Sequence, residues 1–170
     1  ATCELVVSGA TLKLGTGEAQ DANVASFSSV TLENNTALFI ESKSSVINNL
    51  TVNETGARFD IKDTQGVPSS NPYIFGGVTT LKGTLTRVSN GGWGNGVKFE
   101  RLTGAGALDY TNNPNEQSYI AINSLQGFTG DLSFTQTNNN SGAYEVVIKS
   151  GPAAVSMNTI TVGCKNKDEA

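Results

Sequence analysis

The stretch SSVTLENNTALFIE, residues 28–41, holds two short runs of alternating apolar and polar residues around a central turn. Side chains of a β-strand point to opposite faces in turn, so Val30 and Leu32 share one face while Thr31 lies on the other. The polar residues Glu33 to Asn35 then separate this run from a second apolar run. The stretch therefore predicts a strand-turn-strand unit with one buried and one solvent-facing side.

Similar units recur along the whole chain. The copies read NNLTVNETGARFDI (48–61), GGVTTLKGTLTRVS (76–89), KFERLTGAGALDYT (98–111) and NSLQGFTGDLSFTQ (123–136), with partial copies at ELVVSGATLKL (4–14) and MNTITVGC (157–164). If Val30, Leu50, Val78, Leu102 and Leu125 are equivalent, successive copies lie 20, 28, 24 and 23 residues apart. These intervals are close to one coil of a parallel β-solenoid, in which inward residues stack from coil to coil. We therefore expect an all-β parallel β-helix of about six coils.

Three stretches rich in Gly, Pro and Asn interrupt the units. They are DTQGVPSSNPYIFGG (63–77), SNGGWGNG (89–96) and TNNPNEQS (111–118). Gly and Asn tolerate a positive φ and Pro fixes φ, so the composition predicts loops at a corner of the coils. We expect one β domain over residues 1–164, followed by a polar tail or linker, KNKDEA (165–170).

A β-sandwich or jelly roll is the alternative fold, because its strands also alternate and also end in frequent turns. The two cysteines, Cys3 and Cys164, distinguish the two folds. Strands stack about 4.8 Å apart, so roughly six coils would separate the ends by about 29 Å. A disulfide tolerates only about 7 Å between Cα atoms. A Cys3–Cys164 bond is therefore expected in a sandwich and not in a straight solenoid.

The composition argues against several functional classes. The chain has no histidine, which removes the commonest general base and metal ligand, and its net charge of −4 does not favour nucleic acid. No apolar run is long enough to insert this segment into a membrane. We expect no catalytic site, no metal and no cofactor.

Trp93, the single tryptophan, lies among four glycines in SNGGWGNG. The ring could stack on a sugar, with Asn95 supplying a hydrogen bond and Tyr73 of the preceding loop a second ring. Alternatively the indole folds back over apolar strand ends, and loop aromatics more often do this. The acids Glu41 and Asp60 could approach Asp63 on adjacent coils, but a solvated face shared with nearby basic residues is the expected arrangement.

Residues 119–134, YIAINSLQGFTGDLSF, resemble the repeat of bacterial autotransporter passenger domains, where a small polar turn is followed by an aromatic-Thr-Gly step. Ile122-Asn123-Ser124 and Phe128-Thr129-Gly130 provide these two parts. LTGAGALDYT (102–111) resembles the Gly-x-Gly-x-Leu stretch of that family. The resemblance implies a right-handed β-helix within a large secreted or outer-membrane-anchored protein, in a family whose members serve mostly as adhesins, stalks or transport-assisting segments.

The first functional hypothesis is therefore a non-catalytic, extracellular structural or adhesive segment whose partner is a glycan or protein of a host or cell surface. A carbohydrate-binding sandwich is the alternative. A polysaccharide-acting enzyme with acids on a solenoid face is a third hypothesis. Because a solenoid end exposes unpaired strands, we also expect end-to-end self-association.

Overall fold

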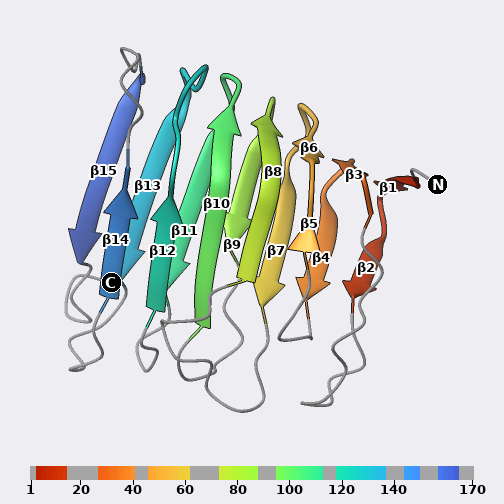
Figure 1. The fold of residues 1–170 in the computed structure, drawn as a ribbon, viewed down its shortest axis with the longest axis horizontal. Helices are drawn as coiled ribbons and strands as arrows, with labels where there is room; N and C mark the ends of the chain where they lie inside the picture. Colours follow the sequence, from red (N-terminus) through yellow and green to blue (C-terminus); the bar gives the residue numbers. More distant parts are fainter. Residues whose placement is uncertain are drawn as a thin grey trace.

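The molecule is an all-β stack of parallel strands, as the sequence predicts (Figure 1). The computed structural model describes residues 3–14, 27–40, 46–61, 73–87, 95–112, 118–136, 144–149 and 157–164. Every strand pair in these ranges is parallel. Parallel pairing throughout is the arrangement of a β-solenoid, and it contradicts the antiparallel sandwich alternative.

Two sheets run along the stack. The first sheet contains β1 (Glu4–Ser8), β3 (Ser29–Glu33), β6 (Leu50–Val52), β8 (Tyr73–Leu81), β10 (Asn95–Thr103), β12 (Ser118–Ile122) and β14 (Tyr144–Ile148), in that order, and β5 (Val46–Ile47) also pairs with β8. The second sheet contains β2 (Thr11–Leu14), β4 (Thr36–Ile40), β7 (Ala57–Ile61), β9 (Thr84–Arg87), β11 (Ala107–Asn112), β13 (Asp131–Gln136) and β15 (Thr159–Cys164).

Each coil consists of one strand of the first sheet and the next strand of the second. Seven strands follow the path of each sheet, so the described residues form seven such pairs, one more than the six or so coils expected. The difference arises at the two ends, where each partial copy of the repeat belongs to a complete coil. Residues 4–14 contain both β1 and β2, and residues 157–164 contain the second strand of the coil that β14 begins.

Inward side chains form continuous rows from coil to coil. Val30 pairs with Leu50, Leu50 with Thr79 and Thr79 with Leu102, and all four are buried. The proposed equivalence of Val78 is therefore wrong by one residue, since Val78 pairs with Arg101 and is only partly buried. The cause is an irregularity in β8, where the register shifts between Phe99 and Arg101 of the neighbouring strand.

Aromatic rings fill the middle of the stack. Phe75 and Phe99, on neighbouring strands of the first sheet, stack with centroids 4.7 Å apart. Phe59 of the second sheet meets both edge-on, at 6.3 and 6.5 Å. These contacts close the space between the two sheets, and each of the three rings is at most 1% exposed. The core therefore runs along the stack axis.

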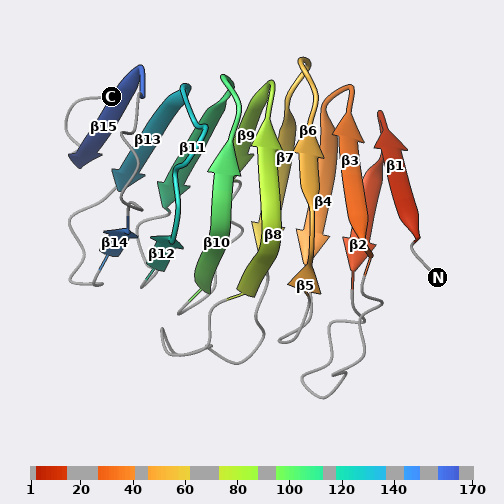
Figure 2. The same ribbon diagram turned by 45° about the horizontal axis from the view of Figure 1, so that its top comes forward.

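The tight turns from the first sheet to the second lie along one edge of the stack (Figure 2). The connections back to the first sheet include residues 62–72, 88–94 and 113–117, which lie outside the described residues. The three predicted loops belong to these connections, but their bounds were wrong. Residues 73–77, 95–96 and 111–112 are strand residues. Their Gly, Pro and Asn neighbours suggested loops, yet apolar Ile74 and Phe75 pair with Lys98 and Phe99.

A column of glycines allows the tight turns to stack closely. A Cβ added to Gly83 would lie 2.1 Å from the Asn53 carbonyl oxygen, and one on Gly106 would lie 2.1 Å from that of Gly83. One on Gly130 would lie 1.6 Å from the Gly106 oxygen. Backbone hydrogen bonds join the same turns, including Ala107 N to Gly83 O at 3.2 Å and Asp131 N to Gly106 O at 3.1 Å. The turns therefore approach backbone to backbone at these glycines, where there is no room for a side chain.

Candidate functional site

The backbones of two predicted binding residues lie near one another at the edge opposite the tight turns. Tyr73 begins β8 and Asn95 begins β10, and these two strands are hydrogen-bonded neighbours. Tyr73 pairs with Val97, two residues beyond Asn95. Trp93 lies outside the described residues, and the side chains of Tyr73 and Asn95 are likewise not described. The loops that were predicted to share a corner therefore do lead into adjacent strands, while the role of their rings stays a prediction.

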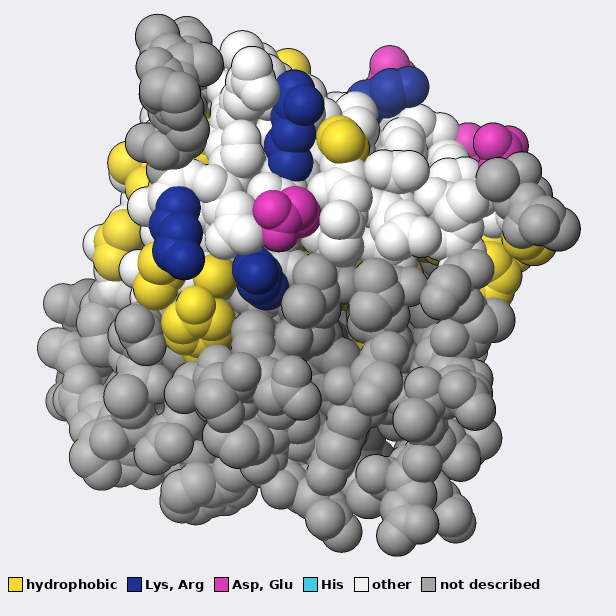
Figure 3. Space-filling model, in the orientation of Figure 1, with side chains coloured by type: hydrophobic (Ala, Val, Ile, Leu, Met, Phe, Trp, Pro, Cys, Tyr) yellow, Lys and Arg dark blue, Asp and Glu magenta, His cyan; other side chains and the backbone are white. Residues whose placement is uncertain are grey.

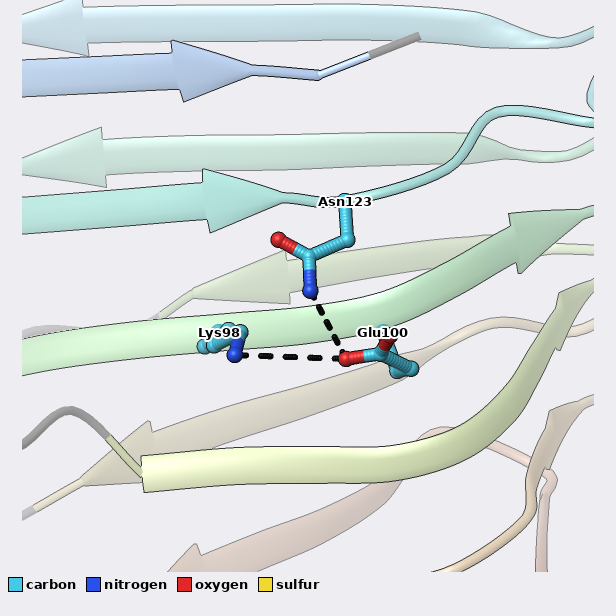
Figure 4. A network of polar contacts seen from close by, with 3 residues as sticks. All are labelled: Lys98, Glu100 and Asn123. Carbon is cyan, nitrogen blue, oxygen red and sulfur yellow. Dashed lines mark hydrogen bonds and ion pairs between the residues drawn. The ribbon is translucent and has the colours of Figure 1, made fainter. Parts of the chain in front are cut away.

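Within the first sheet, several coils have a corner marked by consecutive outward residues. In β10, Phe99 and Leu102 are fully buried while Glu100 and Arg101 between them face outward, and the strand bends there (Figure 4). In the coil before β8, Asn48 and Asn49 hold the corresponding place. Two successive outward residues break the strict alternation of a strand, so the sheet turns a corner without losing its pairing.

Polar side chains at this corner bond from one coil to the next. The Asn49 amide donates to the Ser28 carbonyl at 3.1 Å, and its Oδ1 accepts from the Val78 amide at 3.0 Å. The Asn123 Nδ2 donates to Glu100 Oε2 at 2.7 Å, and the Lys98 ammonium lies 4.0 Å from the same oxygen (Figure 4). Lys98 and Glu100 are 31% and 49% exposed, so this ion pair is solvated and contributes little to stability.

A row of threonines lies along the outward face of the first sheet. Thr31 pairs with Thr51, Thr51 with Thr80, and Thr80 with Thr103. The hydroxyls of Thr80 and Thr103 are 3.0 Å apart and hydrogen-bonded. We call these four residues the threonine ladder. In the space-filling view the described part of the visible face is mostly neutral, with a few charged side chains (Figure 3).

A polar depression of about 360 Å³ lies at the turn edge. It is lined by Glu33, Asn34, Asn53, Glu54, Thr55 and Lys82. Four residues separate β6 from β7, whereas two separate the strands of the coils on either side, so the middle turn differs in length from its neighbours. Asn53 Nδ2 donates to Glu33 Oε1 at 2.5 Å, and the backbone N–H of Asn34 donates to Thr55 Oγ1 at 2.7 Å. These bonds tie the walls of the depression together.

One basic residue lies inside the stack, which the sequence analysis missed. Arg87 is 2% exposed and follows Phe59 in the inward row of the second sheet. Its guanidinium carbon lies 4.7 Å from the centroid of the Tyr110 ring, a favourable cation–π distance. The alternation that places Leu85 inward also places Arg87 inward, so the sequence TLTR, residues 84–87, predicts a buried arginine.

The predicted carboxylate cluster is only partly described. Asp60 pairs with Phe39 in the second sheet, and Glu41 and Asp63 lie outside the described residues. Among the residues the structure describes, no three or more His, Cys, Asp or Glu side chains are grouped so that they could hold a metal ion. Over the same ranges, no helix has the length and apolar character needed to cross a membrane.

Cys3 is an exposed, free thiol, and its carbonyl accepts hydrogen bonds from Ser28 N and Oγ at 3.2 and 2.9 Å. The strand that ends in Cys164, β15, lies at the opposite end of the stack from β1 and β2. The disulfide between Cys3 and Cys164 was expected only in a sandwich, and that condition is not met.

Comparisons with protein-family models, with curated proteins and with solved structures found no match to this chain.

Proposed function

We propose that this chain is a non-catalytic β-solenoid segment of a larger extracellular surface protein, where it serves as a stalk or an adhesive surface. One observation carries the proposal: outward polar side chains bond from coil to coil along the stack. These bonds include Asn34 to Ser8, Asn53 to Glu33, Asn49 to Ser28 and Val78, Thr80 to Thr103, Asn123 to Glu100, and Asn158 to Asp131. Side chains used in this way link each coil to the next.

Such a stack suits a projecting role. Each coil contacts only its neighbours, so length can grow by addition of coils while the outer surface keeps a constant repeat. The threonine ladder is one such repeated surface, and neutral hydroxyls can bind the polar groups of a glycan or protein. The resemblance of residues 119–134 to autotransporter passenger repeats supports the same role, together with a secreted or outer-membrane-anchored parent protein.

The exposed thiol of Cys3 provides a test of extracellular location. A membrane-impermeant maleimide is applied to intact cells that produce the parent protein, and the modified peptide is identified by mass spectrometry. We expect modification of Cys3 on intact cells, because its side chain is free and exposed. The Cys3→Ser variant is the matched control and should lose this modified peptide. Modification of Cys3 only after lysis would contradict the proposal.

Adhesion is tested separately. Beads coated with the folded chain are passed over immobilised surface glycoproteins, and retention is compared with that of beads carrying a Thr51→Lys/Thr80→Lys variant. These substitutions place charge in the middle of the threonine ladder. The adhesive form of the proposal predicts that retention falls in the variant; equal retention would leave only the stalk role.

Glycan binding at the loop edge is a second candidate, favoured by the placement of Tyr73 and Asn95 at the starts of adjacent strands. With Trp93 two residues before Asn95, three sugar-binding side chain types would lie close together. A Trp93→Ala variant that loses glycan binding at an unchanged melting temperature would support this candidate. A lowered melting temperature in a chain that never bound glycan would instead indicate that the indole packs on the stack.

A further inference from the structure

The last strand of the second sheet exposes residues of the inward rows. Phe134 is fully buried, but Val162, its partner on β15, is 68% exposed. Leu132 is 1% exposed, but its partner Ile160 is 48% exposed. Both members of each pair lie in the same row, but Leu132 and Phe134 are on β13 and have β15 beyond them, whereas Ile160 and Val162 are on β15 itself. An inward residue of this stack is therefore buried by the next coil, and within the described residues no strand lies beyond β15.

The backbone edges at the two ends of the second sheet complement each other. Within the described residues, β15 pairs with β13 alone and β2 with β4 alone. All strands of this sheet run parallel, so the outer edge of β2 and the outer edge of β15 are the two opposite edges of one ladder. A translation along the stack brings one edge onto the other with the strand direction unchanged. Unpaired edges of this kind are templates for pairing with another chain.

We propose that a second copy of this chain stacks head to tail on the first, with its β2 pairing in parallel with β15. The register follows from the rows already present. Thr11 belongs to the row that continues through Ala37, Arg58, Thr86, Asp109 and Ser133 to Thr161. Continued across the contact, this row places Thr161 beside the second copy's Thr11 and Val162 beside its Leu12.

Side-chain type is compatible with this register. Leu12 is partly buried on its own chain, and Val162 offers it an apolar neighbour that is now exposed to water. The strand TITVGC of β15 contains no charged residue, and the one charge of β2, on Lys13, would lie beside Gly163. No like charges meet between these two strands. Because the contact joins two different surfaces by translation, it does not close and would build a filament.

Cysteine cross-linking tests the register. Cys3 and Cys164 are replaced by serine, and Thr11→Cys and Thr161→Cys are introduced together. Paired strands place the two Cα atoms about 4.8 Å apart across the contact, within the range for a disulfide. Within one chain, six strand intervals separate the same residues by about 29 Å, so no intramolecular bond can form. Mild oxidation should give a ladder of dimers, trimers and longer species, with 11–161 as the linked peptide pair.

The Thr161→Cys variant without a cysteine at position 11 is the matched control, and it should remain monomeric on oxidation. Disulfides between two copies of position 161 would show a tail-to-tail contact and overturn the head-to-tail arrangement. Sedimentation of the unsubstituted chain gives a second readout that needs no cysteine variant. Its mean mass should rise with concentration. The Val162→Lys variant should stay monomeric at the same concentrations. The Thr51→Lys variant, substituted in the middle of the stack, should associate as the unsubstituted chain does. A monomer at every concentration would overturn the proposal, whatever the outcome of the cell-surface labelling.

Discussion

Two buried threonines have opposite hydrogen-bonding environments. Thr36 and Thr79 are 0% and 1% exposed. The Thr36 hydroxyl lies 3.0 Å from the Val7 carbonyl oxygen and 2.5 Å from that of Glu33. The Thr79 hydroxyl, in contrast, has no partner within the part of the chain that the structure describes. Thr79 occupies a row of Val30, Leu50 and Leu102, where an aliphatic side chain would leave no polar atom unsatisfied.

We therefore expect Thr79→Val to stabilise the fold by about 1 kcal/mol, because it removes an unsatisfied buried hydroxyl at constant shape. Thr36→Val should destabilise it by about 1–2 kcal/mol, because the hydrogen bonding of the Thr36 hydroxyl to the Val7 and Glu33 carbonyl oxygens is lost. Urea unfolding of both variants measures the two changes. Equal destabilisation by both substitutions would contradict the assignment of Thr79 as unpaired.

At some positions the sequence pattern does not decide which side chain faces inward. VTTL, residues 78–81, contains two adjacent threonines, so alternation alone cannot decide which of Val78 and Thr79 faces inward. The register shift in β8 selects Thr79, and such a shift depends on the neighbouring strand, not on the local sequence. At Arg87 the alternation predicts an inward side chain, which the structure has, whereas the general tendency of arginines to face water predicts the opposite.

At the scale of the elements, the glycine column controls how closely the turns approach. Gly106→Ala places a Cβ 2.1 Å from the Gly83 carbonyl oxygen, so the turns between β8 and β9 and between β10 and β11 must separate. We expect a loss of about 1–3 kcal/mol in unfolding free energy, typical of overpacking. Gly163→Ala is the control, since nothing lies within 4 Å of its added Cβ. A Gly106→Ala variant as stable as the control would refute the close stacking of the turns.

Asp131 joins the last two strands of the second sheet. Its pKa is lowered from the ordinary value of 3.8, first by the hydrogen bond from the Thr159 hydroxyl and then by that from the Asn158 amide. A carboxyl whose folded pKa lies below its unfolded value contributes stability above the unfolded value and loses it as pH falls through the folded pKa. The bonds between β13 and β15 should therefore weaken below a pH of about 3.8.

The melting temperatures of the unsubstituted chain and of Asp131→Asn, compared between pH 7 and pH 2, measure this effect. The unsubstituted chain should have the higher value at neutral pH, and the difference should shrink as the pH falls below 3.8. A difference that stays constant over this range would mean that ionisation of Asp131 has no part in the contact.

Element type was easier to predict than element bounds. The repeated alternation specified the strands of most coils, because a period of two is visible wherever one face is buried. The strand β12 (Ser118–Ile122) and the strand β14 (Tyr144–Ile148) had no place in the repeat. β12 precedes the corner at Asn123 and Ser124, and β14 pairs with β12, so both lie before the part of the coil that the repeat covers. The start of β8 was assigned to a loop, since the Gly and Pro residues around Tyr73 obscured its pairing with Val97.

For the whole molecule, the stack predicts an uneven distribution of stability. Interior coils have neighbours on both sides and terminal coils on one, so opening free energies should rise from the ends to the middle. In hydrogen exchange of dilute protein, amides of β2 and β15 should exchange faster than those of β9 and β11. At high concentration, head-to-tail stacking should protect β2 and β15 selectively. Uniform exchange along the chain would contradict a nearest-neighbour stack.

The two edges of the stack also differ in what they would allow a protein engineer to add. At the turn edge, carbonyl oxygens stand where a Cβ on Gly83, Gly106 or Gly130 would be, so any side chain introduced at these glycines would separate adjacent turns. The connections at the opposite edge already differ in length, as residues 41–45 and residues 62–72 do, while the strands they join keep the same parallel pairing. Foreign peptides, epitopes or tags spliced into that edge would be displayed at intervals set by the coil spacing of about 4.8 Å.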